Sequence, residues 1–452
     1  MPNIAFIHPD LGIGGAERLV VDAAMALKTQ PNDSANSVSI FTSHCDPDHC
    51  FEEVSRGEFD LHVYGDYLPT NVAGKLSIVF AFLRQLYLVL KMIFLGELGQ
   101  YDLIVVDQLA YCIPLLHLLK RHDAKILFYC HFPDKLLASH NGFLRSLYRA
   151  VFDSIEEWTT CKADKIVVNS EFTRKTVLNQ FHSLANEALD VVYPCVPSAI
   201  DIDNKSVIEA AKLVQKSPFF LSINRFERKK HIELAVQSYA LYVSQTGDSS
   251  QKLVISGGYD DRIAENVSYL KDLEQLCDHH KLSHFTSFNG DLSNESVQVL
   301  FLPSISTNLK NALLLSTDLL MYTPSYEHFG IVPLEAMRLG KLVLADNTGG
   351  PLETVVNYFD HRDTYTGFTV EADVEKWSDI LELIKGFSDN ELQEVSLRNK
   401  QRIQDHFSFL ALRKSLYKAI DTCEPKAFVY EKFLPYVVIA SILTIAVYIA
   451  NQ

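Results

Sequence analysis

The chain has 452 residues, a length typical of two or three domains. Its formal net charge of −15 argues against a nucleic-acid-binding protein, because such proteins present basic surfaces to phosphate. Hydrophobic residues make up 48% and charged residues 21% of the chain, a balance typical of folded proteins rather than disordered ones.

Short apolar runs alternate with helix-like segments through the first half of the chain. The run at 3–7 is followed by the glycine-rich stretch HPDLGIGG and then by a segment with helical periodicity. Further apolar runs of strand length lie at 38–43, 103–106, 126–130 and 165–170. Continuous apolar runs that alternate with helices predict a doubly wound sheet of buried parallel strands.

The same alternation restarts after a polar, proline-containing stretch at 191–206. The second set of apolar runs lies at 219–226, 252–258, 284–290, 319–325 and 341–346. Two such halves would leave a cleft at the carboxyl ends of their strands, which is where ligands of doubly wound folds bind. We therefore predict a domain over 1–195, a linker over 196–215, a domain over 216–400 and a closing helical segment over 401–425.

The C-terminal segment 433–450, FLPYVVIASILTIAVYIA, contains no charged residue. As a helix it would be about 27 Å long, close to the ~30 Å hydrocarbon core of a bilayer. We predict a transmembrane anchor here that leaves the rest of the chain in the cytosol. A buried terminal core helix is the alternative.

A second apolar stretch, 76–95, has a different pattern. Ser77, Arg84 and Lys91 recur every seven residues and would form one narrow polar stripe on a helix. Two cations near the centre of a bilayer are costly, so this segment is not expected to span. We expect a helix at the membrane surface, with a plain core helix as the alternative.

The stretch EHFGIVPLEAM places Glu327 and Glu335 on either side of an expected helix start. The amides of Gly330, Ile331 and Val332 would lack partners within that helix and could hold a phosphate. The two carboxylates could accept hydrogen bonds from the sugar and ribose hydroxyls of a nucleotide sugar. The alternative is a pair of acids favoured by the dipole at a helix start.

The stretch RFERKKH, 225–231, carries four cations in an acidic chain. A diphosphate leaving group requires neutralisation by cations as its bond to the sugar breaks. We select Arg225 and Lys230 for this role and expect Arg228 and Lys229 to face solvent. A solvated basic turn without a ligand is the alternative.

The stretch GIGGAER, 12–18, follows the first predicted strand. Gly12 and Gly14 begin a G-x-G-x-x-G pattern, but Glu17 stands at its third glycine. A glutamate there would oppose a pyrophosphate, which disfavours an NAD-binding oxidoreductase. We predict instead that Gly14, Gly15 and Glu17 line an acceptor site.

The stretch YCHFPD, 129–134, ends another predicted strand. Its His131 can hydrogen-bond a sugar hydroxyl, and a satisfied structural histidine is the alternative.

No metal site or other cofactor is predicted. The eight cysteines contain no C-x-x-C spacing, so we expect reduced thiols rather than a zinc site. The D-x-D pairs Asp46/Asp48 and Asp201/Asp203 stand apart from the other motifs, and we interpret them as loop acids.

Taken together, these motifs resemble glycosyltransferase family 4, whose members are retaining enzymes of the GT-B fold. The likeness covers about residues 3 to 420. It rests on the E-x7-E pair Glu327 and Glu335, the R-x4-K pair Arg225 and Lys230, the GGAE segment at 14–17, and His131.

The resemblance implies two Rossmann-like domains that face a cleft, with the acceptor on the N-terminal domain and the nucleotide sugar on the C-terminal one. It also implies catalytic roles for Arg225, Lys230 and Glu327 at the departing diphosphate and the sugar. Glu335 would hold the ribose, and His131 would contact the transferred sugar.

Within that family, three stretches resemble the GDP-mannose-dependent α-1,3/1,6-mannosyltransferases of dolichol-linked oligosaccharide assembly. They are MPNIAFIHPDLGIGGAERLVVDAA, YCHFPDKLL and YEHFGIVPLEAM. This resemblance implies GDP-mannose as donor and a dolichyl-diphosphate-linked Man-GlcNAc2 acceptor. It further implies the cytosolic face of the endoplasmic reticulum membrane as location, and other mannosyltransferases of the pathway as candidate partners.

Two alternatives remain open at this point. Another family 4 transferase could use a different donor, such as a UDP-sugar. A catalytically inactive, membrane-tethered binding module would keep the fold, although the intact E-x7-E and R-x4-K pairs argue against it.

Overall fold

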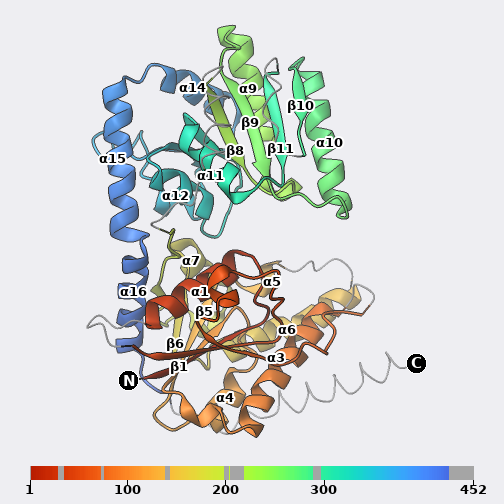
Figure 1. Cartoon of the computed structure of the whole chain (residues 1–452), viewed down its shortest axis with the longest axis vertical. Helices are drawn as coiled ribbons and strands as arrows, with labels where there is room; N and C mark the ends of the chain where they lie inside the picture. Colours follow the sequence, from red (N-terminus) through yellow and green to blue (C-terminus); the bar gives the residue numbers. More distant parts are fainter. Residues whose placement is uncertain are drawn as a thin grey trace. The chain divides into compact units, whose positions relative to one another are not determined.

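The computed structural model describes residues 2–28, 35–72, 76–137, 143–197, 203, 218–288 and 297–426. The chain divides into two compact units: unit 1 is Met1–Cys195 with Leu412–Gln452, and unit 2 is Val196–Ala411 (Figure 1). The predicted linker lies largely outside the described residues, and the predicted anchor helix at 433–450 lies wholly outside them.

Unit 1 is built on a seven-stranded parallel sheet in the order β3-β2-β1-β4-β5-β6-β7. The strands are β1 (Asn3–His8), β2 (Ser37–Thr42), β3 (Asp60–Val63), β4 (Leu103–Asp107), β5 (Lys125–Cys130), β6 (Lys165–Val168) and β7 (Asp190–Val191). The chain builds outward from β1 in one direction and then from β4 in the other. The order therefore reverses between β1 and β4, at the position where doubly wound folds bind ligands.

Helices cover both faces of this sheet. They are α1 (Gly15–Lys28), α2 (Glu52–Ser55), α3 (Ser77–Phe94), α4 (Ile113–Leu119), α5 (Asp134–Leu137), α6 (Phe143–Thr160) and α7 (Glu171–Gln180), with 3-10 turns η1 (Leu98–Gln100) and η2 (His182–Leu184). Apolar residues of α3, α4 and α7 share one core with alternate residues of β1, β4 and β5. The helix α16 (Phe409–Asp421) enters unit 1 from Leu412 onward.

Unit 2 repeats the architecture with a second seven-stranded parallel sheet, in the order β10-β11-β9-β8-β12-β13-β14. Its strands are β8 (Phe219–Ile223), β9 (Lys252–Gly257), β10 (His284–Thr286), β11 (Val299–Pro303), β12 (Leu319–Tyr322), β13 (Leu342–Asp346) and β14 (Phe368–Val370). Here the order reverses between β8 and β12, which pair through Leu319 and Phe220.

The helices of unit 2 divide between the two faces of its sheet. They are the 3-10 turn η3 (Arg228–Lys230), α9 (Glu233–Thr246), α10 (Ala264–His279), α11 (Thr307–Ser316), α12 (Ile331–Arg338), α13 (Pro351–Thr354), α14 (Val374–Lys385) and α15 (Asp389–His406). One core is shared by α9, α10 and α14 and includes the fully buried Trp377 and Tyr239. The prediction of two doubly wound α/β halves is thus confirmed.

The apolar stretch at 76–95 forms α3. Within the described residues, this is the one helix long and apolar enough to cross a bilayer by length and composition, and 39% of it is buried. Its Arg84 and Gln85 are buried, and Gln85 bonds the carbonyl of Leu109 at 2.6 Å. Leu90 and Phe94 lie on the outer face, with exposed fractions of 47% and 87%.

Candidate functional site

In unit 2, the carboxyl ends of β8 and β12 bring together two residues that are far apart in the chain. Lys230 ends the 3-10 turn that follows β8, and Glu327 lies in the loop that follows β12. The Lys230 Nζ and Glu327 Oε2 atoms lie 2.5 Å apart, and both side chains are mostly buried. The Thr323 hydroxyl donates to the Lys230 carbonyl oxygen at 2.7 Å, which ties the 3-10 turn to the end of β12.

The Glu327 carboxylate is held in its charged form. Burial by itself would raise the pKa of this carboxyl, but the charge and hydrogen bond of Lys230 hold the pKa below its ordinary value. The Tyr322 hydroxyl, buried beneath the loop, also favours the carboxylate. A fixed negative group beside a fixed ammonium is therefore present at the position where the strand order reverses.

The helix start predicted after Glu327 is present. Gly330 is the N-cap of α12 with φ 84°, a left-handed conformation that side chains rarely adopt. A Cβ atom at this position would also lie 3.3 Å from the ring of Tyr322. Glycine thus lets the loop turn tightly into α12, so that the amides of Ile331 and Val332 lie in its first turn.

Glu335, inside α12, has a partner that the sequence analysis missed. Lys310 of α11 reaches both of its carboxylate oxygens, at 2.8 and 3.0 Å. No local signal in the sequence identifies Lys310, because α11 and α12 are brought together only by tertiary packing.

The remaining cations of RFERKKH are more exposed than Lys230. Arg225 has a side chain 62% exposed that pairs with Glu227 at 3.1 Å. Arg228 pairs with Asp272 and is 52% exposed, while Lys229 is 67% exposed. The structure thus separates Lys230, which is enclosed, from the three cations that reach solvent.

In unit 1, the glycine loop and His131 lie at the carboxyl edge of the sheet. Gly15 begins α1, directly after β1, and the Glu17 carboxylate folds over Gly14, where an added Cβ atom would lie 2.2 Å from Glu17 Oε2. His131 directly follows β5. The charge of Glu17 is close enough to contribute to the raised pKa of His131.

His131 belongs to a buried cluster whose other members the sequence analysis missed. Its Nε2 atom lies 2.9 Å from Asp107 Oδ1, and the Nδ1 atom of His8 lies 2.8 Å from Asp107 Oδ2. His8 and Asp107 are the last residues of β1 and β4. Each of these two residues is a polar residue at the end of a buried apolar run, and this local signal could have identified His8 and Asp107 as candidates.

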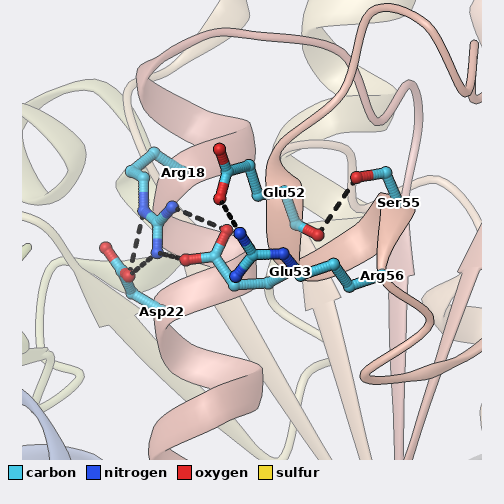
Figure 2. A network of polar contacts seen from close by, with 6 residues as sticks. All are labelled: Arg18, Asp22, Glu52, Glu53, Ser55 and Arg56. Atoms are coloured by element: carbon cyan, nitrogen blue, oxygen red, sulfur yellow. Dashed lines mark hydrogen bonds and ion pairs between the residues drawn. The ribbon is translucent and has the colours of Figure 1, made fainter.

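A network around Arg18 anchors α1, the helix that begins at the glycine loop (Figure 2). The Arg18 guanidinium bonds Asp22 within α1, with Nε to Oδ1 at 3.0 Å, and bonds Glu53 of α2 at 2.9 Å. Burial raises the pKa of the Asp22 carboxyl, and the Arg18 hydrogen bond opposes that rise. Glu52 and Arg56 form a separate ion pair at 2.6 Å on the exposed side of α2.

Within the described ranges of the chain, no three His, Cys, Asp or Glu side chains are grouped so that they could hold a metal ion. The amide of Asp48 donates to Asp46 Oδ1 at 3.0 Å, an arrangement typical of a loop turn.

Two family models match the chain. The model described as Glycosyltransferase Family 4 matches residues 13–199, and the model described as Glycosyl transferases group 1 matches residues 203–404. Among solved structures, sucrose-phosphate synthase from Thermosynechococcus elongatus is 18% identical with a TM-score of 0.67, covering 94% of this chain and 100% of that one. Anabaena Alr3699/HepE in complex with UDP and glucose is 17% identical with a TM-score of 0.62, covering 93% and 100%. These structures share the two-domain α/β fold.

The fold, the carboxyl-edge residues and the family models together define a glycosyltransferase of the GT-B class. Curated relatives narrow this class further. The α-1,3/1,6-mannosyltransferase ALG2 of Candida albicans is 50% identical, covering 93% of this chain and 97% of the relative. The same enzyme of Saccharomyces cerevisiae is 46% identical, covering 93% and 84%. The chain belongs to this family of α-1,3/1,6-mannosyltransferases.

Proposed function

We propose that the protein transfers mannose from GDP-mannose to a dolichyl-diphosphate-linked Man-GlcNAc2 acceptor, forming α-1,3 and α-1,6 linkages in N-glycan precursor synthesis. The observation that carries this proposal is the enclosed Lys230–Glu327 pair, which lies where the strand order of unit 2 reverses. The chain that contains this pair is 50% identical to a named α-1,3/1,6-mannosyltransferase. The sugar, the guanine nucleotide and the lipid carrier are inferred from that family membership.

On this proposal, unit 2 binds the donor. Arg225, Lys230 and the amides at residues 330–332 neutralise the diphosphate as the bond between it and mannose C1 breaks. Glu335 accepts hydrogen bonds from the ribose. Glu327 positions the mannose and stabilises the positive charge that develops at C1.

Unit 1 binds the acceptor on this proposal. Gly14, Gly15 and Glu17 line the acceptor site, and His131 contacts the transferred sugar. An acceptor hydroxyl attacks mannose C1 on the face that the diphosphate leaves, so the α configuration is retained. A phosphate oxygen of the departing GDP takes the hydroxyl proton.

The exposed apolar residues of α3 support a place at a membrane surface. Leu90 and Phe94 of this helix and the following Leu95 are 47%, 87% and 50% exposed. Tyr67, which precedes the helix, packs edge-on against Tyr87 of α3. Such a face can enter the interfacial region of a bilayer, which is where a lipid-linked acceptor is held. We place the catalytic units at the cytosolic face of the endoplasmic reticulum membrane.

The test is to incubate the purified full chain with GDP-mannose and a lipid-linked Man-GlcNAc2 acceptor and to map the linkages of the product. Two added mannoses, one α-1,3 and one α-1,6, are expected. A parallel incubation with UDP-glucose tests the rival donor, and excess GDP should compete with GDP-mannose where UDP does not. Transfer of glucose, or competition by UDP alone, would contradict the proposal.

A further inference from the structure

Three side chains converge at the reversal point of the sheet in unit 1. His8 ends β1, Asp107 ends β4 and His131 follows β5, and these three strands are adjacent in the sheet. The two oxygens of the Asp107 carboxylate form separate hydrogen bonds. Oδ2 lies 2.8 Å from the Nδ1 atom of His8, and Oδ1 lies 2.9 Å from the Nε2 atom of His131. One carboxylate thus bridges two imidazoles.

We propose that Asp107 and His8 are positioning residues for His131, and that they hold its ring with the Nδ1 atom directed to the sugar substrate. This inference deepens the proposed function, because it rests on His131 as a sugar-contacting residue.

The protonation pattern follows from the chemistry of the bridge. A carboxylate only accepts hydrogen bonds, so both imidazole nitrogens that face Asp107 must carry protons. His131 is therefore protonated at Nε2, and its Nδ1 atom has no hydrogen-bond partner among the described residues. The His131 side chain is 20% exposed, so the ring is partly accessible to a ligand.

His8 occupies a costly environment for a structural residue. Its side chain is fully buried, and within the described chain its Nε2 atom has no hydrogen-bond partner. An unpaired buried polar atom costs about 1–3 kcal/mol, and an apolar side chain at this position would avoid that cost. An apolar side chain could not form the hydrogen bond that His8 makes to Asp107, which gives a reason for a histidine at this position.

Electrostatics around His131 agree with this arrangement. Burial, the largest single influence, would lower the pKa of the His131 imidazole, but the charge and hydrogen bond of Asp107 together with the charge of Glu17 raise the pKa above its ordinary value. The Tyr129 ring lies 5.0 Å from the His131 ring, and the Tyr129 hydroxyl is committed to the Val192 carbonyl at 2.6 Å. In its protonated form, His131 can donate from Nδ1 to a sugar oxygen.

The experiment combines NMR titration of the His131 ring with kinetics, in the full chain labelled with 13C-histidine. The His131 signal is assigned by its loss in His131→Gln. In Asp107→Asn, the pKa of His131 should fall by about 1–3 units, because the neighbouring negative charge is removed.

Two substitutions of His8 separate positioning from packing. In His8→Asn, the side-chain amide can reproduce the Nδ1–H donor, so the His131 titration and kcat should stay close to wild type. In His8→Leu, the donor is lost, the Asp107 charge is less compensated, and the pKa of His131 should rise. Its kcat should fall by about 10- to 100-fold with an unchanged KM for GDP-mannose, because misplacing a contact by about 1 Å costs on the order of 10²-fold.

The inference is overturned if Asp107→Asn leaves the His131 titration unchanged, or if His8→Asn and His8→Leu behave alike. Failure of the proposed function would look different. In that case the titrations would shift as described, while the wild-type chain itself would transfer no mannose.

Discussion

The ammonium of Lys230 and the carboxylate of Glu327 lie 2.5 Å apart although 97 positions separate the two residues in the chain. The parallel pairing of β8 with β12 produces this contact, since each residue follows the carboxyl end of one of these neighbouring strands. Each group neutralises the other in a largely enclosed position. A nucleotide-sugar donor would meet a cation and an anion that are already oriented.

On the proposed function, Lys230→Ala should lower the rate of mannose transfer by about 10²-fold, because the variant loses a cation that would stabilise the departing diphosphate. Steady-state kinetics with GDP-mannose measure the change. Lys229→Ala is the matched control, since this neighbouring lysine is 67% exposed and should leave the rate near that of wild type. Equal losses in both variants would contradict the assignment of Lys230.

The same variant should change how stability depends on pH. In the wild type, Lys230 holds the pKa of Glu327 below its ordinary value, so the pair stabilises the fold above about pH 4 and this contribution is lost as the pH falls through the lowered pKa. Without Lys230, burial raises that pKa. Denaturant titrations should therefore show a deficit for Lys230→Ala at pH 7 that shrinks toward pH 4.

If Glu335 binds the ribose as proposed, Lys310→Met should weaken donor binding, because Glu335 loses the ammonium that contacts both of its oxygens. A hydrogen bond between charged groups contributes about 1.5–3 kcal/mol, so the KM for GDP-mannose should rise about tenfold or more. Lys376→Met removes an exposed ion pair with Glu371 in the same unit and should leave the KM unchanged. An unaltered KM in Lys310→Met would contradict the proposed role of Glu335 in donor binding.

Gly330→Ala should destabilise the loop that leads into α12. A non-glycine residue in the left-handed region costs about 1–2 kcal/mol, and the added methyl group would press on the Tyr322 ring at 3.3 Å. Gly99→Ala is the matched control, because a Cβ atom there has no neighbour within 4 Å and its φ is not positive. Free energies of unfolding from urea titration should fall for the first variant and stay unchanged for the second.

Arg18→Met should destabilise unit 1 by about 1.5–3 kcal/mol at pH 7, because the buried Asp22 carboxylate loses its charged partner (Figure 2). Arg56→Met is the matched control, since its ion pair with Glu52 is mostly exposed and should be worth no more than about 1 kcal/mol. Denaturant titrations of both variants give the two values.

The pH dependence of Arg18→Met has a definite sign. Burial already raises the pKa of Asp22, and removing Arg18 raises it further. A carboxyl whose pKa is higher in the folded state than in the unfolded state destabilises the fold above the unfolded pKa, which is about 4. The deficit of the variant should therefore grow from pH 4 to pH 7, and a deficit independent of pH would contradict the pairing.

Local patterns in the sequence predicted most of the elements and pointed to several residues of the candidate site. Continuous apolar runs of strand length marked ten of the fourteen described strands, because a strand covered on both faces has no polar side. The sequence analysis did not predict β3, β7, β11 and β14. The stretch EHFGIVPLEAM predicted the start of α12, because a glycine and a proline constrain backbone dihedral angles locally. These are properties of neighbouring residues, which is why the sequence alone carries them.

Tertiary structure alone decided which of those residues meet. The strand order of unit 2 places Lys230 against Glu327 and leaves Arg225 exposed. The basic stretch at 225–231 does not by itself indicate which of its four cations is enclosed. The pairing of Glu335 with Lys310 depends on how α11 packs on α12.

The clustering of His8, Asp107 and His131 could not be predicted for the same reason. It exists only because β1, β4 and β5 are neighbours in a sheet whose connections cross over from strand to strand. Parallel strands need long crossover connections, so residues of one site come from distant parts of the chain. Their contact is a product of sheet pairing, which no local pattern encodes.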